Sequence, residues 1–327
     1  MPYEHEKQVA FEAALSAAKL CEQVRQEMGP EAMEKKDGTP VTVADFGSQA
    51  LICRTIANAF PADQIVAEED GTTLGGPRMT GALKKITEYV QNIMSDATQE
   101  AVIDWINRGN GDVGPRYWAI DPIDGTKGFL RGDQYAVAVA LVEQGEVKLG
   151  ILACPSLCIN PGDKGGEEGV LFLALRGQGA SMFPMNGGPF TPIHVADPDQ
   201  NPNLPLVESV ETTHCDHHQQ HAVCKAVGVK VPPLRVDGQG KYGIVARGEA
   251  ALYLRFPSAE AAPYLEKIWD HAAGAIIVEE AGGRVTDMQG GVLDFSRGPD
   301  MVGNPGIIAG NLSIHEKVLE VLRLNSC

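Results

Sequence analysis

The chain has 327 residues and a strongly acidic composition. Lys and Arg together number 27 against 43 Asp and Glu, so the formal net charge at pH 7 is −16. This charge argues against DNA or RNA as a partner, because proteins that bind these polymers normally present a basic surface to the phosphates. Hydrophobic residues make up 43% of the chain, and its 37 glycines and 21 prolines indicate many turns. Length and composition therefore favour a two-domain α/β or α+β enzyme over a disordered chain or a helical bundle.

The cysteines and the N-terminus indicate a cytoplasmic protein. The seven cysteines are scattered and form no CxxC motif, which is typical of reduced thiols in an intracellular protein. The N-terminal residues lack the pattern of a secretory signal or a transit peptide. No apolar run approaches the ~18 residues that a bilayer span needs. We therefore expect a cytoplasmic protein without a membrane partner, and an organellar form stays open.

The first half of the sequence combines helical and strand patterns. Apolar residues at three- and four-residue spacing predict helices, and short β-branched runs between turn residues predict strands. The predicted helices cover 9–28, 45–59, 83–94 and 101–106, and the predicted strands cover 64–67, 117–120, 135–142, 147–153 and 169–175. Residues 144–146 have the length of a hairpin connection. The region 71–115 has the character of an insertion that lies over another part of the fold.

A loop-rich segment over 184–205 separates the two halves. We place the domain boundary there, between an N-terminal domain over 1–200 and a C-terminal domain over 201–327. The second half alternates strands and helices, which predicts a sheet covered by helices on both faces. Its predicted strands cover 206–210, 234–236, 251–256, 284–286 and 306–309, and its predicted helices cover 216–226, a stretch from 240, 266–281 and 314–324.

The most informative segment is Asp121-Pro-Ile-Asp124-Gly-Thr126, which follows an apolar strand. Aspartates at the end of a strand often only stabilise a turn, and for a single Asp that interpretation would be preferred. Two carboxylates with a hydroxyl two residues later also supply what a hard divalent cation needs, namely oxygen ligands at short range and a group that holds a water molecule. The segment therefore favours a metal site.

Two further acidic segments repeat this pattern. Glu68-Glu69-Asp70 follows the predicted strand 64–67, and three adjacent acids repel one another unless solvent or a metal reduces the cost. A solvated loop and a metal ligand explain this triplet equally well. Asp270 falls inside an apolar, small-residue stretch of a predicted helix. A surface aspartate is the simpler interpretation, but the neighbouring Trp269 indicates burial, and a buried aspartate requires a partner.

The acidic segments closely resemble motifs of the magnesium-dependent, lithium-sensitive phosphomonoesterase superfamily that includes inositol monophosphatase. The matching segments are VTVADFGSQALI (41–52), AEED (67–70), DPIDGTKGFLRG (121–132) and KIWDHAAGAIIVEEAGG (267–283). The resemblance runs from about residue 35 to 310 and implies the layered αβαβα sandwich of that fold. Within the superfamily, TKGFLRG and EKIWDHAAG look most like the 3′(2′),5′-bisphosphate nucleotidases, which convert 3′-phosphoadenosine 5′-phosphate to AMP.

The resemblance implies a site for two or three Mg²⁺ ions. The implied metal ligands are the carboxylates of Glu68, Asp121, Asp124 and Asp270 and the carbonyl of Ile123, with Glu69 acting through water. Asp45 and Thr126 are implied to orient and deprotonate the attacking water. Gly125 and Thr126 are implied to offer backbone N–H groups to the substrate phosphate.

The resemblance places the substrate-selecting residues in the second half of the chain. Lys241 is the candidate for the non-scissile 5′-phosphate, because an ammonium group is a good phosphate partner. His214 and Gln239 are weaker candidates near the base. Related nucleotidases usually have Ser where Gly238 stands, so one hydroxyl contact is expected to be missing. We interpret Arg255 as a surface residue.

We therefore expect a monomeric Mg²⁺-dependent phosphomonoesterase that removes the 3′-phosphate of 3′-phosphoadenosine 5′-phosphate. Its substrate is a small nucleotide bisphosphate, and 3′-phosphoadenosine 5′-phosphosulfate is a second candidate substrate. An inositol polyphosphate 1-phosphatase is the nearest alternative, because it would share all the metal residues. A non-catalytic nucleotide sensor on the same scaffold is an alternative of another class. The presence of both Asp45 and Thr126 argues against the sensor, because a binding protein does not need to activate water.

Overall fold

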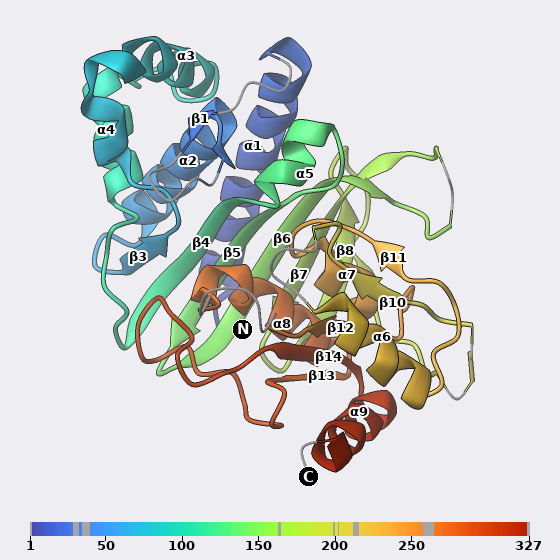
Figure 1. Ribbon diagram of the computed structural model, residues 1–327. Coiled ribbons are helices and arrows are strands. Elements are labelled where there is room, and N and C mark those ends of the chain that lie inside the picture. Colours follow the sequence, from blue (N-terminus) through green and yellow to red (C-terminus); the bar gives the residue numbers. More distant parts are fainter. Residues whose placement is uncertain are drawn as a thin grey trace.

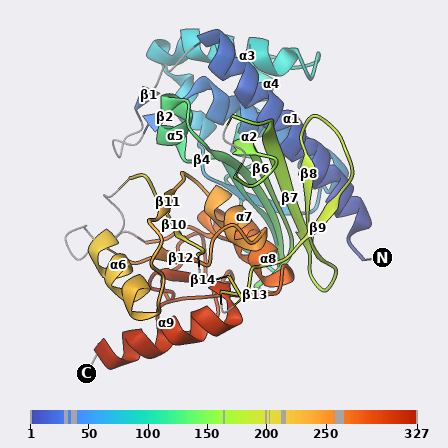
Figure 2. The ribbon, with the colours of Figure 1, turned by 90° about the vertical axis from the view of Figure 1, so that its right-hand side faces the viewer.

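The protein is built from five stacked layers, which alternate helices and sheets (Figures 1 and 2). The architecture is seen in a computed structural model that describes residues 2–28, 33–34, 40–162, 165–198, 200–201, 203–211, 216–257 and 265–325. Three clusters of buried apolar side chains fill the spaces between neighbouring layers. The layered αβαβα sandwich expected from the sequence is therefore confirmed.

The first sheet and its helices use the chain up to residue 193. Their elements are α1 (Glu4–Met28), β1 (Met33–Glu34), β2 (Pro40–Val41), α2 (Val43–Ala59), β3 (Gln64–Ala67), η1 (Gly71–Gly75), η2 (Pro77–Met79), α3 (Thr80–Gln91), α4 (Gln99–Asn107), β4 (Arg116–Asp124), α5 (Thr126–Arg131), β5 (Ala136–Glu143), β6 (Glu146–Cys158), β7 (Glu168–Leu175), β8 (Gly179–Pro184) and β9 (Thr191–Ile193). Strands β1 and β2 pair with each other as a separate two-stranded sheet. Among the described residues, the first sheet has seven strands in the order β3-β4-β5-β6-β7-β8-β9. The β3–β4 pair is parallel, and the other strand pairs described for this sheet are antiparallel.

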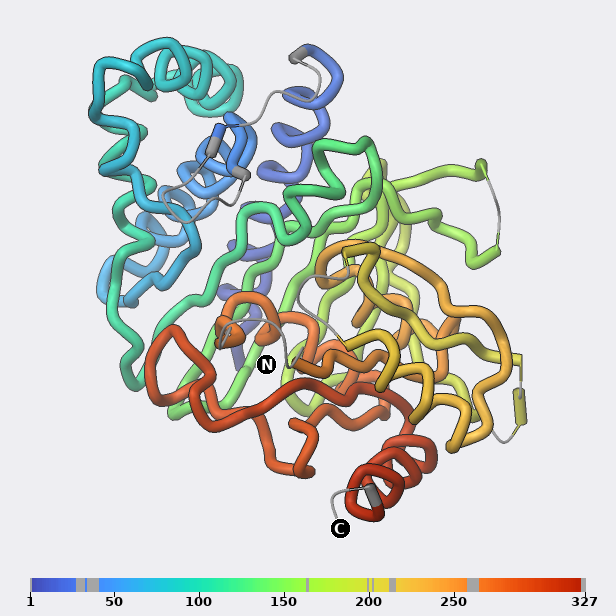
Figure 3. The backbone as a smooth tube through the Cα atoms, viewed as in Figure 1, coloured from blue at the N-terminus to red at the C-terminus, as the bar shows by residue number. Residues whose placement is uncertain are grey.

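The first sheet is buried on both faces, and its side chains alternate between two cores. Trp118 and Ile120 of β4 face α1 and α2 on one side, whereas Tyr117 and Ala119 face the helices between the sheets, as the period of a strand requires. The insertion from η1 to α4 packs on α2 and lies at one end of the molecule (Figure 3). The long apolar runs of these strands follow from burial on both faces.

The second sheet and its helices use the rest of the chain. Their elements are β10 (Leu206–Glu208), α6 (His217–Ala226), β11 (Leu234–Arg235), α7 (Gly240–Ala246), β12 (Leu252–Arg255), η3 (Ile268–Asp270), α8 (Ala272–Glu280), β13 (Gly283–Thr286), β14 (Ile307–Asn311) and α9 (Leu312–Asn325). In the described part of the chain, five strands form this sheet in the order β11-β10-β12-β14-β13. Helices α7 and α8 lie between the two sheets, and α6 and α9 cover the outer face (Figure 2). The predicted covering of both faces is confirmed, while the division near residue 200 stays a prediction.

Three local predictions were wrong, and two of them concern acidic segments. The strand predicted to end at Ile120 continues to Asp124, because pairing with β5 resumes at Asp124 after an irregularity that follows Asp121. The helix predicted over 266–281 is broken: Asp270 ends the short turn η3, and α8 begins only at Ala272. Asp270 therefore precedes the helix instead of lying inside it. Strands β8 and β9 extend the first sheet up to and into the segment predicted as loop.

His315 of α9 is a fully buried histidine in the second sheet's outer core. The Thr286 hydroxyl donates to the Asp287 carbonyl at 2.9 Å, so it accepts from His315 Nε2, which also lies at 2.9 Å. His315 Nδ1 is buried and has no hydrogen-bond partner among the described residues. Protonation of Nδ1 would bury a donor without an acceptor. Burial, helped by the charge of Arg284, lowers the pKa of His315 to about 4.

His315 is expected to make the folded protein less stable in acid, and His315→Gln should remove this effect. An unfolded histidine binds its proton near pH 6.5, whereas folded His315 binds it only near pH 4, so protons favour the unfolded chain between these values. The measurement is urea unfolding of both proteins in EDTA at about pH 7 and about pH 5. The loss of unfolding free energy on acidification should be smaller in the variant. Equal losses in both proteins would contradict this account of His315.

Candidate active site

Two neighbouring strands bring the first acidic segments together. β3 and β4 are parallel, with Ala67 beside Ile120, so the residues that follow each position lie at the same edge of the sheet. Glu68 follows β3 at this edge, and Asp121 is the next residue of β4. The turn η3 packs against β4 and β5 (Figure 1) and adds Asp270 from the second half of the chain. The predicted acids therefore come from three separate elements and meet in one place.

The acids form one electrostatic cluster. Asp121 is 2% exposed, and burial together with the carboxylates of Glu68, Asp124 and Asp270 raises its pKa well above the usual range. Burial and the carboxylate of Asp124 likewise raise the pKa of Asp270. Burial also raises the pKa of Asp124, although the charges of nearby cations act in the opposite direction. Packing like charges in a buried position is costly, and a bound cation would offset that cost.

The donor set of this cluster fits Mg²⁺. All the groups predicted to bind metal are oxygens, namely four carboxylates and the carbonyl of Ile123, and magnesium prefers oxygen ligands. The Ile123 carbonyl accepts a hydrogen bond from Thr126 Oγ1 at 3.2 Å, and the Ile123 N–H donates to Asp121 Oδ1 at 3.1 Å. These bonds hold the segment from Asp121 to Thr126 in one conformation beside the acids.

Asp45 and Thr126 lie together, as the sequence predicted. Asp45 stands in the first turn of α2 and is fully buried. Its Oδ1 accepts a hydrogen bond from Thr126 Oγ1 at 3.3 Å, and its Oδ2 accepts from Thr42 Oγ1 at 2.6 Å and from Thr42 N at 2.7 Å. Sequence reasoning missed Thr42. The spacing Thr42-x-x-Asp45 is that of a capping box, and this signal could have identified it.

Two more polar residues of α2 hold the loops that carry the predicted metal ligands, and sequence reasoning missed both. Ser48 Oγ donates to the Pro122 carbonyl at 3.0 Å. Gln49 Nε2 donates to the Glu69 carbonyl at 2.6 Å, and Glu69 N donates to Gln49 Oε1 at 2.9 Å. Ser48 and Gln49 follow Asp45 by three and four residues, so all three face the same side of the helix. Polar residues at that spacing within an otherwise apolar predicted helix were the available signal, and it does not identify their partners.

Two of the three side chains predicted to select the substrate, Gln239 and Lys241, lie in the described part of the chain, and both are held by backbone groups. Gln239 lies at the site, since its Nε2 donates to the Trp269 carbonyl at 2.8 Å and its Oε1 accepts from Gly274 N at 3.1 Å. Lys241 is 3% exposed, and its ammonium donates to the Gly238 carbonyl at 2.7 Å and to the Val236 carbonyl at 3.4 Å. His214 lies outside the described residues.

Arg255 is not a surface residue, so that prediction was wrong. Its side chain is 15% exposed, and its Nε donates to Glu266 Oε1 at 2.7 Å. Glu266 is even more deeply buried and follows Arg255 by eleven residues. A buried arginine requires a carboxylate partner, and a partner outside its own strand cannot be identified from local sequence.

Gly238 packs directly against the segment from Asp121 to Thr126, which carries predicted metal ligands. It has φ +65°, and a Cβ at this position would lie 2.2 Å from the Asp124 carbonyl oxygen. Gly125, with φ +94°, faces it so closely that its own Cβ would lie 3.0 Å from Gly238 N. The two loops therefore meet backbone to backbone. This contact accounts for the glycine at position 238, because a side chain there would displace the Asp124 carbonyl.

Gly238→Ala is expected to lower activity at least about 10-fold and to reduce stability by roughly 1–3 kcal/mol, because the methyl group must displace the Asp124 carbonyl. Phosphate release and urea unfolding measure the two effects. Gly132→Ala is the matched control, since Gly132 has φ +79° but a Cβ added there would meet nothing within 4 Å beyond its chain neighbours. Gly132→Ala should lower the free energy of unfolding by about 1 kcal/mol, because alanine is strained at a positive φ. Its activity should stay near that of wild type. Equal activities in the two variants would contradict the proposed contact.

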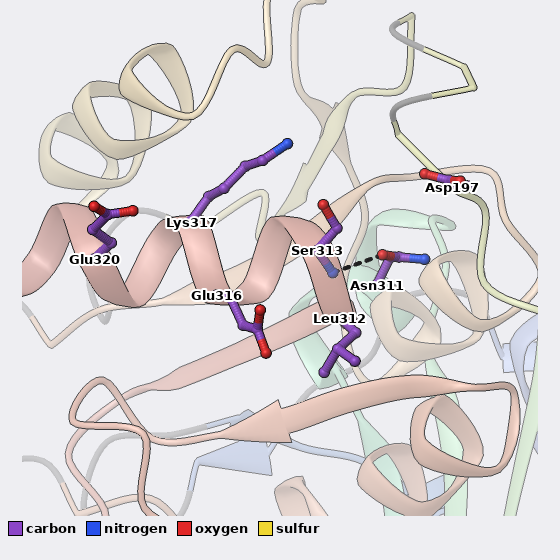
Figure 4. Close-up of a pocket in the computed structure, with 7 residues that line it drawn as sticks. All are labelled: Asp197, Asn311, Leu312, Ser313, Glu316, Lys317 and Glu320. Atoms are coloured by element: carbon purple, nitrogen blue, oxygen red, sulfur yellow. Dashed lines mark hydrogen bonds between the residues drawn. The ribbon is translucent and has the colours of Figure 1, made fainter.

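A surface hollow at the start of α9 contains none of the predicted residues. It is lined by Asp197, Asn311, Leu312, Ser313, Glu316, Lys317 and Glu320 (Figure 4). Asn311 Oδ1 accepts a hydrogen bond from Ser313 N at 2.9 Å, which accounts for the polar start of this helix. The chemistry expected from the sequence therefore belongs to the acid cluster and not to this hollow.

Comparisons with known proteins identify the family of the chain. The model of the inositol monophosphatase family matches residues 3–326. A 3′(2′),5′-bisphosphate nucleotidase of Oryza sativa is 42% identical, over 98% of this chain and 94% of the relative. A protein of the same name from Emericella nidulans is 38% identical, over 99% of each chain.

Solved structures share the fold. An inositol monophosphatase from Anabaena (Nostoc) sp. PCC 7120 matches with a TM-score of 0.63 at 21% identity, over 99% of this chain and 97% of that one. CysQ from Bacteroides thetaiotaomicron matches with a TM-score of 0.60 at 20% identity, over 95% and 98%. Within the described residues, no helix has the length and apolar character that crossing a bilayer needs. The chain belongs to the inositol monophosphatase family.

Proposed function

We propose that the protein is a Mg²⁺-dependent 3′(2′),5′-bisphosphate nucleotidase that hydrolyses 3′-phosphoadenosine 5′-phosphate to AMP and phosphate. The observation that carries the proposal is the cluster of acids around buried Asp121, beside the hydrogen-bonded pair of Asp45 and Thr126. Relatives that bear the nucleotidase name and are 36–42% identical over nearly the whole chain support the choice of substrate. The protein is proposed to work as a cytoplasmic monomer.

The acid cluster is proposed to hold two or three Mg²⁺ ions. The proposed ligands are the carboxylates of Glu68, Asp121, Asp124 and Asp270 and the carbonyl of Ile123. The bound ions supply positive charge that offsets these acids and the charge developing on the phosphate oxygens. The other functions of the site fall to the chain's own groups.

Asp45 is proposed as the general base, acting through Thr126. Thr126 Oγ1 lies 3.3 Å from Asp45 Oδ1 and 3.2 Å from the Ile123 carbonyl, and its single proton is proposed to point to Asp45 during the reaction. The Thr126 oxygen can then accept a hydrogen bond from the attacking water. The water proton passes to Thr126 while the Thr126 proton passes to Asp45. Thr42 keeps the other Asp45 oxygen occupied with two donors, which fixes the carboxylate for this transfer. Water attacks phosphorus directly, and no covalent phosphoenzyme forms.

Groups on both sides of the site are proposed to bind the substrate. The backbone N–H groups of Gly125 and Thr126 would hold the scissile phosphate, where a glycine allows close approach. Lys241 would bind the non-scissile 5′-phosphate by exchanging its 3.4 Å contact with the Val236 carbonyl for a phosphate oxygen. Gln239 and His214 are proposed to lie near the base.

The experiment that tests this function is phosphate release in Mg²⁺ across a small panel of substrates. The panel contains 3′-phosphoadenosine 5′-phosphate, its 5′-phosphosulfate analogue, AMP and inositol 1,4-bisphosphate. We expect kcat/KM for the adenosine bisphosphate to exceed that for inositol 1,4-bisphosphate at least about 100-fold. The reverse order would favour an inositol polyphosphate 1-phosphatase. Tight binding of the adenosine bisphosphate without turnover would favour a sensor.

A further inference from the structure

We propose that a buried chain of four side chains, Tyr242, His271, Glu266 and Arg255, positions Asp270 for metal binding. The proposal rests on the proposed function, because it takes Asp270 as a metal ligand. It adds residues that touch neither the metal nor the substrate but act through Asp270. These are positioning residues and not catalytic ones.

The four side chains form a continuous line of hydrogen bonds. The Tyr242 hydroxyl lies 2.8 Å from His271 Nδ1, and His271 Nε2 lies 3.0 Å from Glu266 Oε2. The other Glu266 oxygen, Oε1, accepts from Arg255 Nε at 2.7 Å. Tyr242 and His271 are at most 1% exposed, and Glu266 is 5% exposed. The chain therefore runs through the protein interior, from α7 to β12.

Only one arrangement of protons satisfies this chain. Glu266 accepts from Arg255, and as a carboxylate it offers His271 only acceptor oxygens. His271 Nε2 must then carry the proton and donate to Glu266. Nδ1 is left as an acceptor, so the Tyr242 hydroxyl donates to it. Every polar atom of the histidine ring has a partner, and this fixes the orientation of the ring.

The chain explains why Glu266 and His271 are not themselves metal ligands. One ligand atom each from Glu266, Asp270 and His271 lies within 4.8 Å of the others, a grouping that could hold an ion. Both ring nitrogens of His271 and both oxygens of Glu266 are already engaged by protein partners. Asp270 is the member of this group whose carboxylate interacts electrostatically with the acid cluster, with Asp124 and with Glu68.

Asp270 needs this support because its own turn is short. It ends η3, a three-residue turn closed by bonds of 3.1 Å from Asp270 N to Lys267 O and 3.3 Å from His271 N to Ile268 O. His271 is the next residue and starts α8 without a capping hydrogen bond from its side chain. Anchoring the His271 ring therefore fixes the backbone from which the Asp270 carboxylate projects. Such outer partners typically change metal affinity about 10- to 100-fold when they are removed.

The test is metal binding measured without substrate, with Mn²⁺ as a probe for the oxygen-ligand site and free Mn²⁺ followed by its electron paramagnetic resonance signal. Glu266→Gln is expected to weaken Mn²⁺ binding at least about 10-fold. Tyr242→Phe is expected to weaken it several-fold, because it leaves His271 Nδ1 without its donor. Tyr242→Phe carries the test if Glu266→Gln fails to fold, since it removes a single oxygen.

Thr286→Val is the matched control. It also removes one hydroxyl bonded to a buried histidine, His315, at 2.9 Å, but on β13 and α9 in the outer part of the second sheet (Figure 2). All variants are expected to melt earlier than wild type without metal, whereas only those of the proposed chain should bind Mn²⁺ more weakly. Unchanged affinity in Tyr242→Phe and Glu266→Gln, with normal binding by wild type, would overturn this inference alone. Wild-type protein that binds no Mn²⁺ would overturn the proposed function as well.

Discussion

Asp121→Asn is expected to lower the rate of Mg²⁺-dependent phosphate release at least about 1,000-fold. The same change is expected to stabilise the metal-free protein. Asp121 is buried among Glu68, Asp124 and Asp270, which with burial raise its pKa. An aspartate in the unfolded chain loses its proton near pH 4, whereas Asp121 in the folded protein loses it only at higher pH. The free energy of unfolding therefore falls as the pH rises between these two pKa values. The melting temperature in EDTA should therefore be higher in the variant than in wild type, by a margin that grows from about pH 5 to about pH 8.

Asp287→Asn provides the control for removal of a buried carboxylate. Asp287 is 3% exposed, but its Oδ1 accepts from the backbone N–H groups of Gln289 and Gly291, each at 2.8 Å, and its Oδ2 accepts from Asn304 Nδ2 at 3.0 Å. Asparagine has one acceptor oxygen and cannot keep both sets of bonds. Its loss should lower the melting temperature with and without metal and leave catalysis intact. If Asp121→Asn also lowered the metal-free melting temperature, the repulsion inferred for the acid cluster would be wrong.

Asp45→Asn is expected to lower kcat by about 1,000-fold to 10,000-fold while Mn²⁺ binding stays at the wild-type level. The asparagine oxygen can still accept from Thr42, so the start of α2 is kept. The carboxylate that takes the Thr126 proton is lost, and an amide group cannot replace it. Steady-state phosphate release and Mn²⁺ binding measure the two effects separately.

A double variant sharpens this prediction. If Asp45 acts through Thr126, both changes remove the same proton transfer. The double variant Asp45→Asn with Thr126→Val should then have a kcat hardly lower than that of the slower single variant. Costs that multiply would mean that the two residues act independently. A weakened Mn²⁺ affinity in Asp45→Asn would place Asp45 among the metal ligands instead.

Local sequence patterns predicted much of the fold. The strand over 64–67 was predicted at its observed bounds, and the helices near 45–59 and 9–28 were predicted within a few residues. These elements depend on periodicity and on end signals within the same segment, which a sequence displays. The five-layer stacking and the full set of metal residues came from the resemblance, whereas the pattern from Asp121 to Thr126 by itself favoured a metal site.

The remaining features depend on contacts that are distant in the sequence. The continuation of β4 to Asp124 reflects its pairing with β5, and the break before α8 places Asp270 at the acid cluster. Arg255 was assigned to the surface because its partner Glu266 lies on another segment. The same holds for Gln49 and Glu69, which are twenty residues apart. Each pair is visible only once the chain is folded.

The acidic charge excluded nucleic-acid polymers at the outset, although the proposed substrate is itself a highly charged nucleotide. Part of the charge of −16 is the acid cluster of Glu68, Asp121, Asp124 and Asp270. Bound Mg²⁺ would offset that charge and make the site attractive to a phosphate. The acidity therefore argues against a long polyanion and is compatible with a small one.

The central claim is that the acid cluster makes phosphate release depend on Mg²⁺. The most direct test is the initial rate of phosphate release from 3′-phosphoadenosine 5′-phosphate as a function of free Mg²⁺, starting from protein treated with EDTA. We predict no release without metal, saturable recovery as Mg²⁺ is added, and no recovery in Asp121→Asn. Release that persists in EDTA, or recovery in Asp121→Asn equal to that of wild type, would contradict the account.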